Sequence, residues 1–332
     1  MRTLLLKVVR LVFVVFIVTF LSFSMLKLQE STSGSDIVDK VAPFGSPEAK
    51  AKLRASLHLN DPFLVQYGRW LGDFVVLDFG LKYTGQGDSA ASGTPVSEIV
   101  KKKLPVSLEL MFYAQVLALL FALPLGILTA YRNGTLFDKG TNILMFAMLA
   151  MPAFLAALLL QIGAANNPVW GLPTQYIGVG DFPLNPFSSA NWEQMLLPTI
   201  SLAIAQIAVY MRLLRSDMIA TLQEDFITTA KAKGIPARRV LLRHAFRPSS
   251  LTLLTVAGLN VGALISGAII VEQIFNLPGI GDELVRSILG TQVVETQALI
   301  AIIAVIYVLV NFFVDLLYTV LDPRIRHARA IA

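Results

Sequence analysis

The side chains that most often perform chemistry in proteins are few and dispersed in this sequence. It has no cysteine, which excludes disulfides, thiolate metal sites and cysteine nucleophiles. The three histidines, His58, His244 and His327, are too far apart in the chain to form a metal-binding motif. No phosphate-binding loop of the GxxxxGK(S/T) type occurs, and no GxSxG or HExxH motif. We therefore predict that the chain is not an enzyme, and that any nucleotide it uses is bound by another subunit.

The most polar long segment, residues 212–248, lies between two strongly apolar runs. Within it, residues 225–233 have a composition that favours a short helix. Gly234 can adopt the left-handed conformation that ends a helix, and Pro236 cannot continue one. The segment carries eight basic residues, which are Arg212, Arg215, Lys231, Lys233, Arg238, Arg239, Arg243 and Arg247.

A short helix that ends in a tight turn makes a compact knob suited to docking. The small side chains of Ala230 and Ala232 would let the knob sit closely in a partner's cleft. Phe226 and Ile227 would then supply apolar anchorage, since aromatic anchors dominate many interfaces. The alternative is a basic loop held at the anionic surface of the membrane.

Three polar residues inside or at the ends of apolar runs are candidates for a transport pathway. These are Glu109, Asn260 and Glu272, which are costly in lipid and must face other helices or water. Structural pairing is the alternative role for each. A stripe of small residues, Gly258, Gly262, Ser266 and Gly267, predicts close packing of the same run against a neighbouring helix, with a helix of a partner subunit as one candidate.

The composition requires the elements that carry these residues to lie in a membrane. Hydrophobic residues make up 55% of the 332 residues and charged residues only 15%, against roughly 25% charged in soluble domains. The apolar runs are continuous rather than alternating, so the predicted fold is all-α, with about 20 residues per membrane crossing. Six runs qualify, at residues 9–26, 106–130, 143–163, 196–211, 251–274 and 299–320. For the fourth, 197–214 is the better span if Pro198 starts the helix.

The distribution of Lys and Arg predicts the orientation. Three Lys or Arg residues lie at the amino end, two at residues 131–142, eight in the 212–248 loop and three in the tail. Residues 164–193 contain no Lys or Arg, and short cytoplasmic loops are the ones that carry an excess of them. Both termini are therefore expected in the cytoplasm, and the first run is expected to be a retained signal anchor. The predicted organisation is residues 1–27 (amino end and first helix), 28–104 (extracytoplasmic), 105–321 (five-helix core with the 212–248 loop) and 322–332 (cytoplasmic tail).

The extracytoplasmic segment contains an aromatic stretch at residues 61–72. Tyr67 and Trp70 are expected either at the level of the lipid headgroups or packed within a small extracytoplasmic cap.

Several motifs follow one another in a fixed order along nearly the whole chain. They are at residues 57–62, 66–71, 78–80, 95–96, 103–110, 229–234, 271–281 and 318–326. Together they resemble a permease subunit of the binding-protein-dependent ABC importers, in the dipeptide and oligopeptide branch that also includes nickel systems.

Two motifs depart from the family pattern. Thr228-Thr229-Ala230 stands where the general signature has Glu-Ala-Ala, and residues 292–297 stand where an Arg-Asp-Tyr-Pro-like patch is usual. The second departure bears on contact with the binding protein.

The resemblance implies a fold like that of type I ABC importers, with six transmembrane helices in the cytoplasmic (inner) membrane of a bacterium or archaeon. It implies pairing with a second permease, two cytoplasmic ATPases that bind ATP and magnesium, and an extracytoplasmic solute-binding protein. No cofactor is expected on this chain itself. The residues expected to dock on the ATPase are Glu224, Asp225, Phe226, Thr229, Ala230, Lys231, Ala232, Lys233 and Gly234.

The implied substrate is a short peptide, and a nickel complex or an oligosaccharide is the alternative within the branch. A self-sufficient secondary transporter is the competing class, but it needs ion- or substrate-binding groups at the midplane, often on broken helices. This chain offers only Asn260 and prolines such as Pro124 and Pro152 for that purpose.

Overall fold

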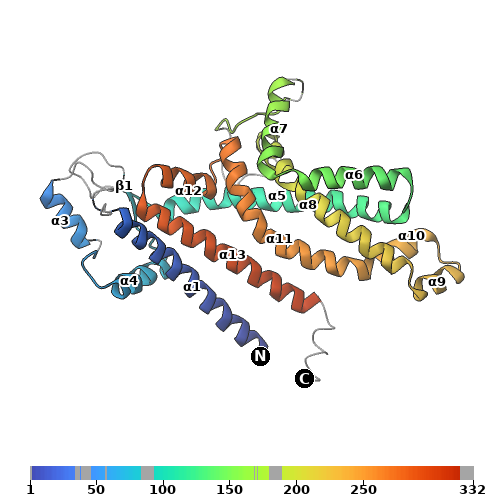
Figure 1. Cartoon of the computed structure of the whole chain (residues 1–332), viewed down its shortest axis with the longest axis horizontal. Helices are drawn as coiled ribbons and strands as arrows, with labels where there is room; N and C mark the ends of the chain where they lie inside the picture. Colours follow the sequence, from blue (N-terminus) through green and yellow to red (C-terminus); the bar gives the residue numbers. More distant parts are fainter. Residues whose placement is uncertain are drawn as a thin grey trace. The chain divides into compact units, whose positions relative to one another are not determined.

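The computed structural model describes residues 2–33, 38, 46–56, 58–83, 93–167, 169, 171–178 and 189–321 (Figure 1). The predicted tail at 322–332 lies outside the described residues. The chain divides into two compact units, one of Met1–Val106 with Pro278–Phe312 and one of Ser107–Leu277 with Phe313–Ala332. Helices dominate both units, as predicted.

Five helices of the described residues are long and apolar enough to cross a membrane. They extend beyond the predicted spans because polar residues at their ends continue the helical hydrogen bonding. Much of the predicted 212–248 loop is therefore helix. The five are α1 (Arg2–Ser33), α5 (Val96–Tyr131), α8 (Ser189–Leu222), α11 (Phe246–Phe275) and α13 (Val293–Leu321).

The third predicted span is not one straight helix. It is divided between α6 (Leu136–Ala150) and α7 (Ala153–Asn166), which are bent by 103°. Met151 is extended, at φ −90° and ψ 111°, because a proline disfavours helical geometry in the residue before it. Pro152 follows and lacks the N–H that a continuing helix requires. The chain has six spans if this bent pair counts as one.

Pro198 does not start its helix, contrary to the prediction. It lies inside α8, which begins at Ser189. Proline is tolerated in membrane helices when the backbone groups it frees find other partners.

In the unit that contains residues 107–277, α8 is the central helix and contacts α6, α7 and α11. Its side chains Tyr210, Met211 and Leu214 are almost fully buried. A Cβ added to Gly267 would lie 2.7 Å from Leu202, and one added to Gly258 would overlap Val314. The small-residue stripe thus packs α11 against helices of its own chain, and the idea that it packs against a partner permease is not supported.

The other unit contains the extracytoplasmic segment of the prediction. Helices α3 (Pro47–Ser56) and α4 (Phe63–Val75) are followed by two short strands, β1 (Leu81–Tyr83) and β2 (Gly93–Pro95), which pair antiparallel. Helix α12 (Ile280–Leu289) precedes α13.

Helix α4 packs on α1 through an aromatic cluster. Tyr67 is only 4% exposed, and its ring lies 5.2–5.7 Å from those of Phe16, Phe20 and Phe23. Its hydroxyl lies 3.0 Å from the hydroxyl of Thr19. Tyr67 therefore packs within the protein, whereas Trp70 stays half-exposed.

A buried network of charges ties β1 and the start of α5 to α12 and α13. The Lys82 Nζ lies 2.5 Å from Glu283 and 3.2 Å from Glu295, and the Lys103 Nζ lies 2.5 Å from Glu283. Asp282 completes it, at 2.8 Å from Arg286 and 3.8 Å from Lys103. The carboxylates are 7% exposed or less, and such charges persist only when they are paired.

The network predicts a loss of stability in acid. Burial alone would raise the pKa of Glu283, but hydrogen bonds from Lys103 and Lys82 outweigh it and lower this pKa from 4.5 to about 2. A carboxylate with a lowered pKa stabilises the fold above its ordinary pKa, and this contribution is lost as the pH falls from 4.5 toward 2. We expect Glu283→Gln to be less stable than wild type at neutral pH and to lose less on acidification. Thermal unfolding of the purified protein across this pH range measures both.

The matched control for this measurement is Glu98→Gln, because Glu98 is exposed on α5 in the same unit. Its acid profile should follow that of the wild type. An equal acid loss in Glu283→Gln and wild type would contradict the prediction.

Candidate coupling surface

The predicted short helix in the segment between α8 and α11 is confirmed as α9 (Asp225–Ala232). Asp225 lies in its first turn and Lys231 in its last, the arrangement that the helix dipole favours. Gly234 has φ +72°, and the Ile235 N–H donates to the Ala230 carbonyl oxygen at 3.3 Å. This left-handed turn ends the helix as predicted.

The face that α9 presents to solvent differs from the one predicted. Ala230 is 6% exposed and Ile227 is fully buried, so both side chains hold α9 against its own chain. They cannot seat in the cleft of a partner without leaving this packing. On α9 the large apolar side chain available for docking is Phe226, which is 48% exposed. Around it the other predicted docking residues are also exposed, namely Glu224, Asp225, Thr229, Lys231, Ala232, Lys233 and Gly234.

The base of α9 is a π-helical turn, η2 (Val240–Ala245), which follows the short α10 (Ala237–Arg239). η2 contacts α8, α9 and α11, and Val240 and Ala245 are buried in it. The Ser249 hydroxyl donates to the Ala245 carbonyl oxygen at 2.9 Å and lies 3.0 Å from the hydroxyl of Thr221 at the end of α8. These contacts join α9 firmly to both long helices. Figure 1 shows α9 and α10 at the end of this unit where α8 ends and α11 begins.

One of the eight basic residues of the segment does not belong to the exposed surface. Arg215 lies on α8 and forms a bidentate pair with Asp138 of α6, with distances of 2.6 Å and 2.8 Å. Asp138 also accepts hydrogen bonds from the Gly134 N–H and the Asn142 amide. The seven other basic residues are exposed, so the surface around α9 remains strongly positive.

The three predicted pathway residues lie in the same unit, and Asn260 and Glu272 lie at different levels of α11. Asn260 hydrogen-bonds with Tyr210, whose hydroxyl donates to Gln115 at 3.1 Å, so it belongs to a polar cluster of α5, α8 and α11. Glu272 is fully buried on α11, twelve residues or about 18 Å along the helix from Asn260. Glu109 is half-buried on α5.

Sequence reasoning missed Gln115 and Tyr210 as partners of Asn260. An amide inside an apolar run is the signal that would have identified Gln115. Nothing in the sequence around Tyr210 indicates that its hydroxyl faces α5 rather than lipid.

The comparison with known families decides the class of the protein. The family described as "Binding-protein-dependent transport system inner membrane component" matches residues 122–327, which include all of α8, α9 and α11. The chain belongs to this family. The permease is similar over nearly its whole length to the oligopeptide transport system permease protein AppB of Bacillus subtilis (strain 168), with 35% identity over 310 residues that cover 93% of this chain and 94% of the relative.

A second relative of the permease is the dipeptide transport system permease protein DppB of Escherichia coli (strain K12). It is 34% identical over 302 residues, which cover 86% of this chain and 87% of the relative. The putative peptide transport system permease protein BAB2_1050 of Brucella abortus (strain 2308) is 32% identical over 97% of this chain and 98% of the relative. The permease is thus a transport subunit of the inner membrane.

Proposed function

We propose that the permease forms half of the translocation pathway of an ATP-driven importer for short peptides. Its three relatives are named as oligopeptide, dipeptide and peptide transport permeases, and they align over 86% of this chain or more. The observation that carries the coupling part of the proposal is α9, a firmly seated short helix that exposes Phe226 within a positive surface. A second, similar permease completes the pathway.

In the proposed mechanism, the exposed face of α9 docks on one of two cytoplasmic ATPases, which bind ATP and magnesium. Closure of the ATPases displaces α9. Because Ile227 and Ala230 pack inward and η2 contacts both long helices, the displacement passes to α8 and α11. The two permeases then shift between inward-open and outward-open states, since ATP favours one of the two. An extracytoplasmic binding protein delivers the peptide.

The proposed orientation places both termini and α9 in the cytoplasm. Seven exposed Lys or Arg residues lie in the 212–248 segment that contains α9, and cytoplasmic loops carry an excess of such residues. On this orientation α3, α4 and the β1–β2 pair lie outside the cytoplasm, where the binding protein docks.

The test is uptake by proteoliposomes that contain the permease with its partner permease, ATPases and binding protein. We expect a labelled dipeptide to accumulate only when ATP is present on the ATPase side. A nickel complex and an oligosaccharide, offered in parallel, should not accumulate. Accumulation of the nickel complex or the oligosaccharide in place of the dipeptide would overturn the assignment of a peptide substrate. Uptake driven by an ion gradient without the ATPases would overturn the whole proposal.

A further inference from the structure

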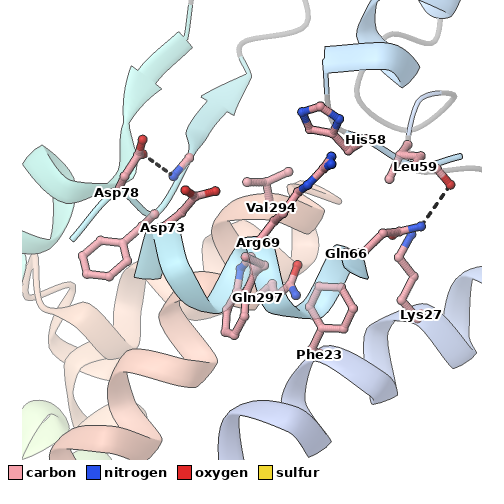
Figure 2. A pocket seen from close by; sticks show the side chains of 13 residues that line it. Phe23, Lys27, His58, Leu59, Gln66, Arg69, Asp73, Asp78, Val294 and Gln297 are labelled. Atoms are coloured by element: carbon pink, nitrogen blue, oxygen red, sulfur yellow. Dashed lines mark hydrogen bonds between the residues drawn. The ribbon is translucent and has the colours of Figure 1, made fainter. Parts of the chain in front are cut away.

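A cavity of about 210 Å³ lies within the unit that carries the amino end, apart from α9 and the polar cluster around Asn260. It is a half-open groove lined by the end of α1, by residues 58–59 and α4, by the residues that lead into β1 and by the start of α13. Phe23, Trp70 and Phe79 supply aromatic walls. Figure 2 shows the polar side chains that surround it.

The position of the cavity along two spanning helices places it at a membrane surface. The apolar window of α1 is Leu6–Ser24 and that of α13 is Val293–Val314. Lys27, one turn beyond the first window, and Val294, at the start of the second, both line the cavity. It therefore lies where hydrocarbon gives way to headgroups, the level at which tryptophan is enriched.

Apolar side chains on the neighbouring helices face outward from the protein. On α1, Val12, Phe13 and Leu21 are 60–62% exposed. On α4, Leu64 and Val75 are 69% and 71% exposed. Helix α4 therefore has polar groups on one side and exposed apolar groups on another, which is typical of a helix that lies in the membrane interface.

The charged side chains that line the cavity are separated by sign, although Asp61 behind the lining pairs with Arg69. Figure 2 shows Asp73 and Asp78 together on one side, and His58 and Arg69 on the other. Arg69 is held by Asp61 at 2.6 Å, and Gly80 donates its N–H to Asp78 at 3.1 Å. Within the described residues, the Asp73 side chain makes no hydrogen bond or ion pair. The cavity thus offers separate places for a negative and a positive group.

We propose that this cavity binds the headgroup of a phospholipid that carries a primary amine beside its phosphate. The phosphate lies toward Arg69 and Lys27, because cationic side chains form the strongest hydrogen bonds with anions. The ammonium group lies toward Asp73 and Asp78. The acyl chains follow the exposed apolar side chains of α1 and α4.

The size of the cavity favours a headgroup over a peptide substrate. Its volume of about 210 Å³ is below the roughly 300–1,000 Å³ of pockets that enclose larger ligands. The bound lipid would fix α4 at the membrane surface, in addition to its aromatic contacts with α1. This role is independent of the solute that the importer carries.

The test is native mass spectrometry of the complete transporter, purified in detergent and supplied with defined lipids. Phosphatidylethanolamine has both groups, phosphatidylcholine has a methylated amine that cannot donate hydrogen bonds, and phosphatidylglycerol has no amine. We expect retention of phosphatidylethanolamine to exceed that of the other two by about three- to tenfold, the effect of one or two partly exposed charged contacts.

Asp73→Asn should remove this preference for the amine while retaining binding of the phosphate, and Arg69→Gln should weaken retention of all three lipids. The matched controls are Glu98→Gln and Lys101→Gln, exposed charges of α5 that do not line the cavity. Asp73→Asn disturbs no contact within the described residues, so its result stands even if Arg69→Gln, which frees Asp61, fails to fold.

Soluble phosphoethanolamine should displace the retained lipid, whereas inorganic phosphate should displace it less. Equal retention of the three lipids would overturn the proposal, and so would a control variant that lowers retention as much as Asp73→Asn. Displacement by a dipeptide at the same concentration as phosphoethanolamine would instead assign the cavity to peptide and overturn the lipid assignment. Dipeptide uptake, measured separately, reports only on the proposed transport function.

Discussion

Replacing Phe226 by aspartate is expected to abolish ATP-dependent uptake while the permease remains folded in the membrane. Phe226 is the large apolar side chain that α9 exposes, at 48%, so about half of it is available to a partner. An aromatic anchor at the centre of an interface contributes about 2 to 4 kcal/mol. The affinity for the ATPase should therefore fall by about thirtyfold or more.

The measurement is co-purification of the ATPases with the permease, together with uptake by proteoliposomes. Leu136→Asp is the matched control, because Leu136 is an exposed leucine, 87% exposed at the start of α6, and lies outside the 212–248 segment. It should leave ATPase binding unchanged. Retained ATPase binding and uptake in Phe226→Asp would exclude α9 as the docking helix.

A second variant, Ala230→Arg, would test how α9 packs on its own chain rather than how it docks on the ATPase. Ala230 lies on the buried side of α9. Ala230→Arg would therefore push α9 away from the rest of its own unit rather than block a partner's cleft. Loss of uptake in that variant would not by itself show that α9 is the surface which touches the ATPase. Phe226 is the more informative position, since its side chain is exposed.

Features that depend on neighbouring residues could be predicted from the sequence. The helix at 225–232, its end at Gly234 and the break at Pro236 all follow from local backbone preferences, and the structure has each of them. The apolar runs likewise predicted every spanning helix, because a window of about 20 apolar residues suffices to identify one. Helix ends were underestimated because polar residues beyond the hydrocarbon can still be helical.

Features that depend on tertiary packing could not be predicted. Which side of α9 faces inward is decided by η2, and η2 is placed by α8 and α11. Lys82 and Glu283 are 201 positions apart, and Asp138 and Arg215 are 77 apart, so no local pattern indicates that they meet. Pro152 and Pro198 have the same local signal, yet one breaks a helix and the other lies within one. The local pattern alone therefore does not decide whether a proline ends a helix or lies within one.

Replacing Arg215 by glutamine is expected to destabilise the permease, because Arg215 forms an ion pair with the buried Asp138. The Asp138 side chain is 4% exposed and the Arg215 side chain 20% exposed. Removing the arginine leaves a buried carboxylate whose remaining partners are the Gly134 N–H and the Asn142 amide. Breaking a buried ion pair in this way costs about 3 to 5 kcal/mol. We expect the thermal unfolding midpoint of the purified permease to fall clearly.

Asp138→Asn should cost less, because the uncompensated arginine can still reach water whereas the uncompensated aspartate cannot. The double variant should then lose less than the two single losses combined, since both members of the pair are gone. Arg212→Gln is the matched control, a change of an exposed arginine three positions earlier on α8, expected within about 0.5 kcal/mol of wild type.

If Arg215→Gln unfolds at the same temperature as Arg212→Gln, the pair does not hold α6 to α8. If Arg215→Gln instead loses more stability than Asp138→Asn, and the double variant less than their sum, the pair holds the broken span α6 against the helix that leads into α9. Displacement of α9 would then reach α6 as well as α11.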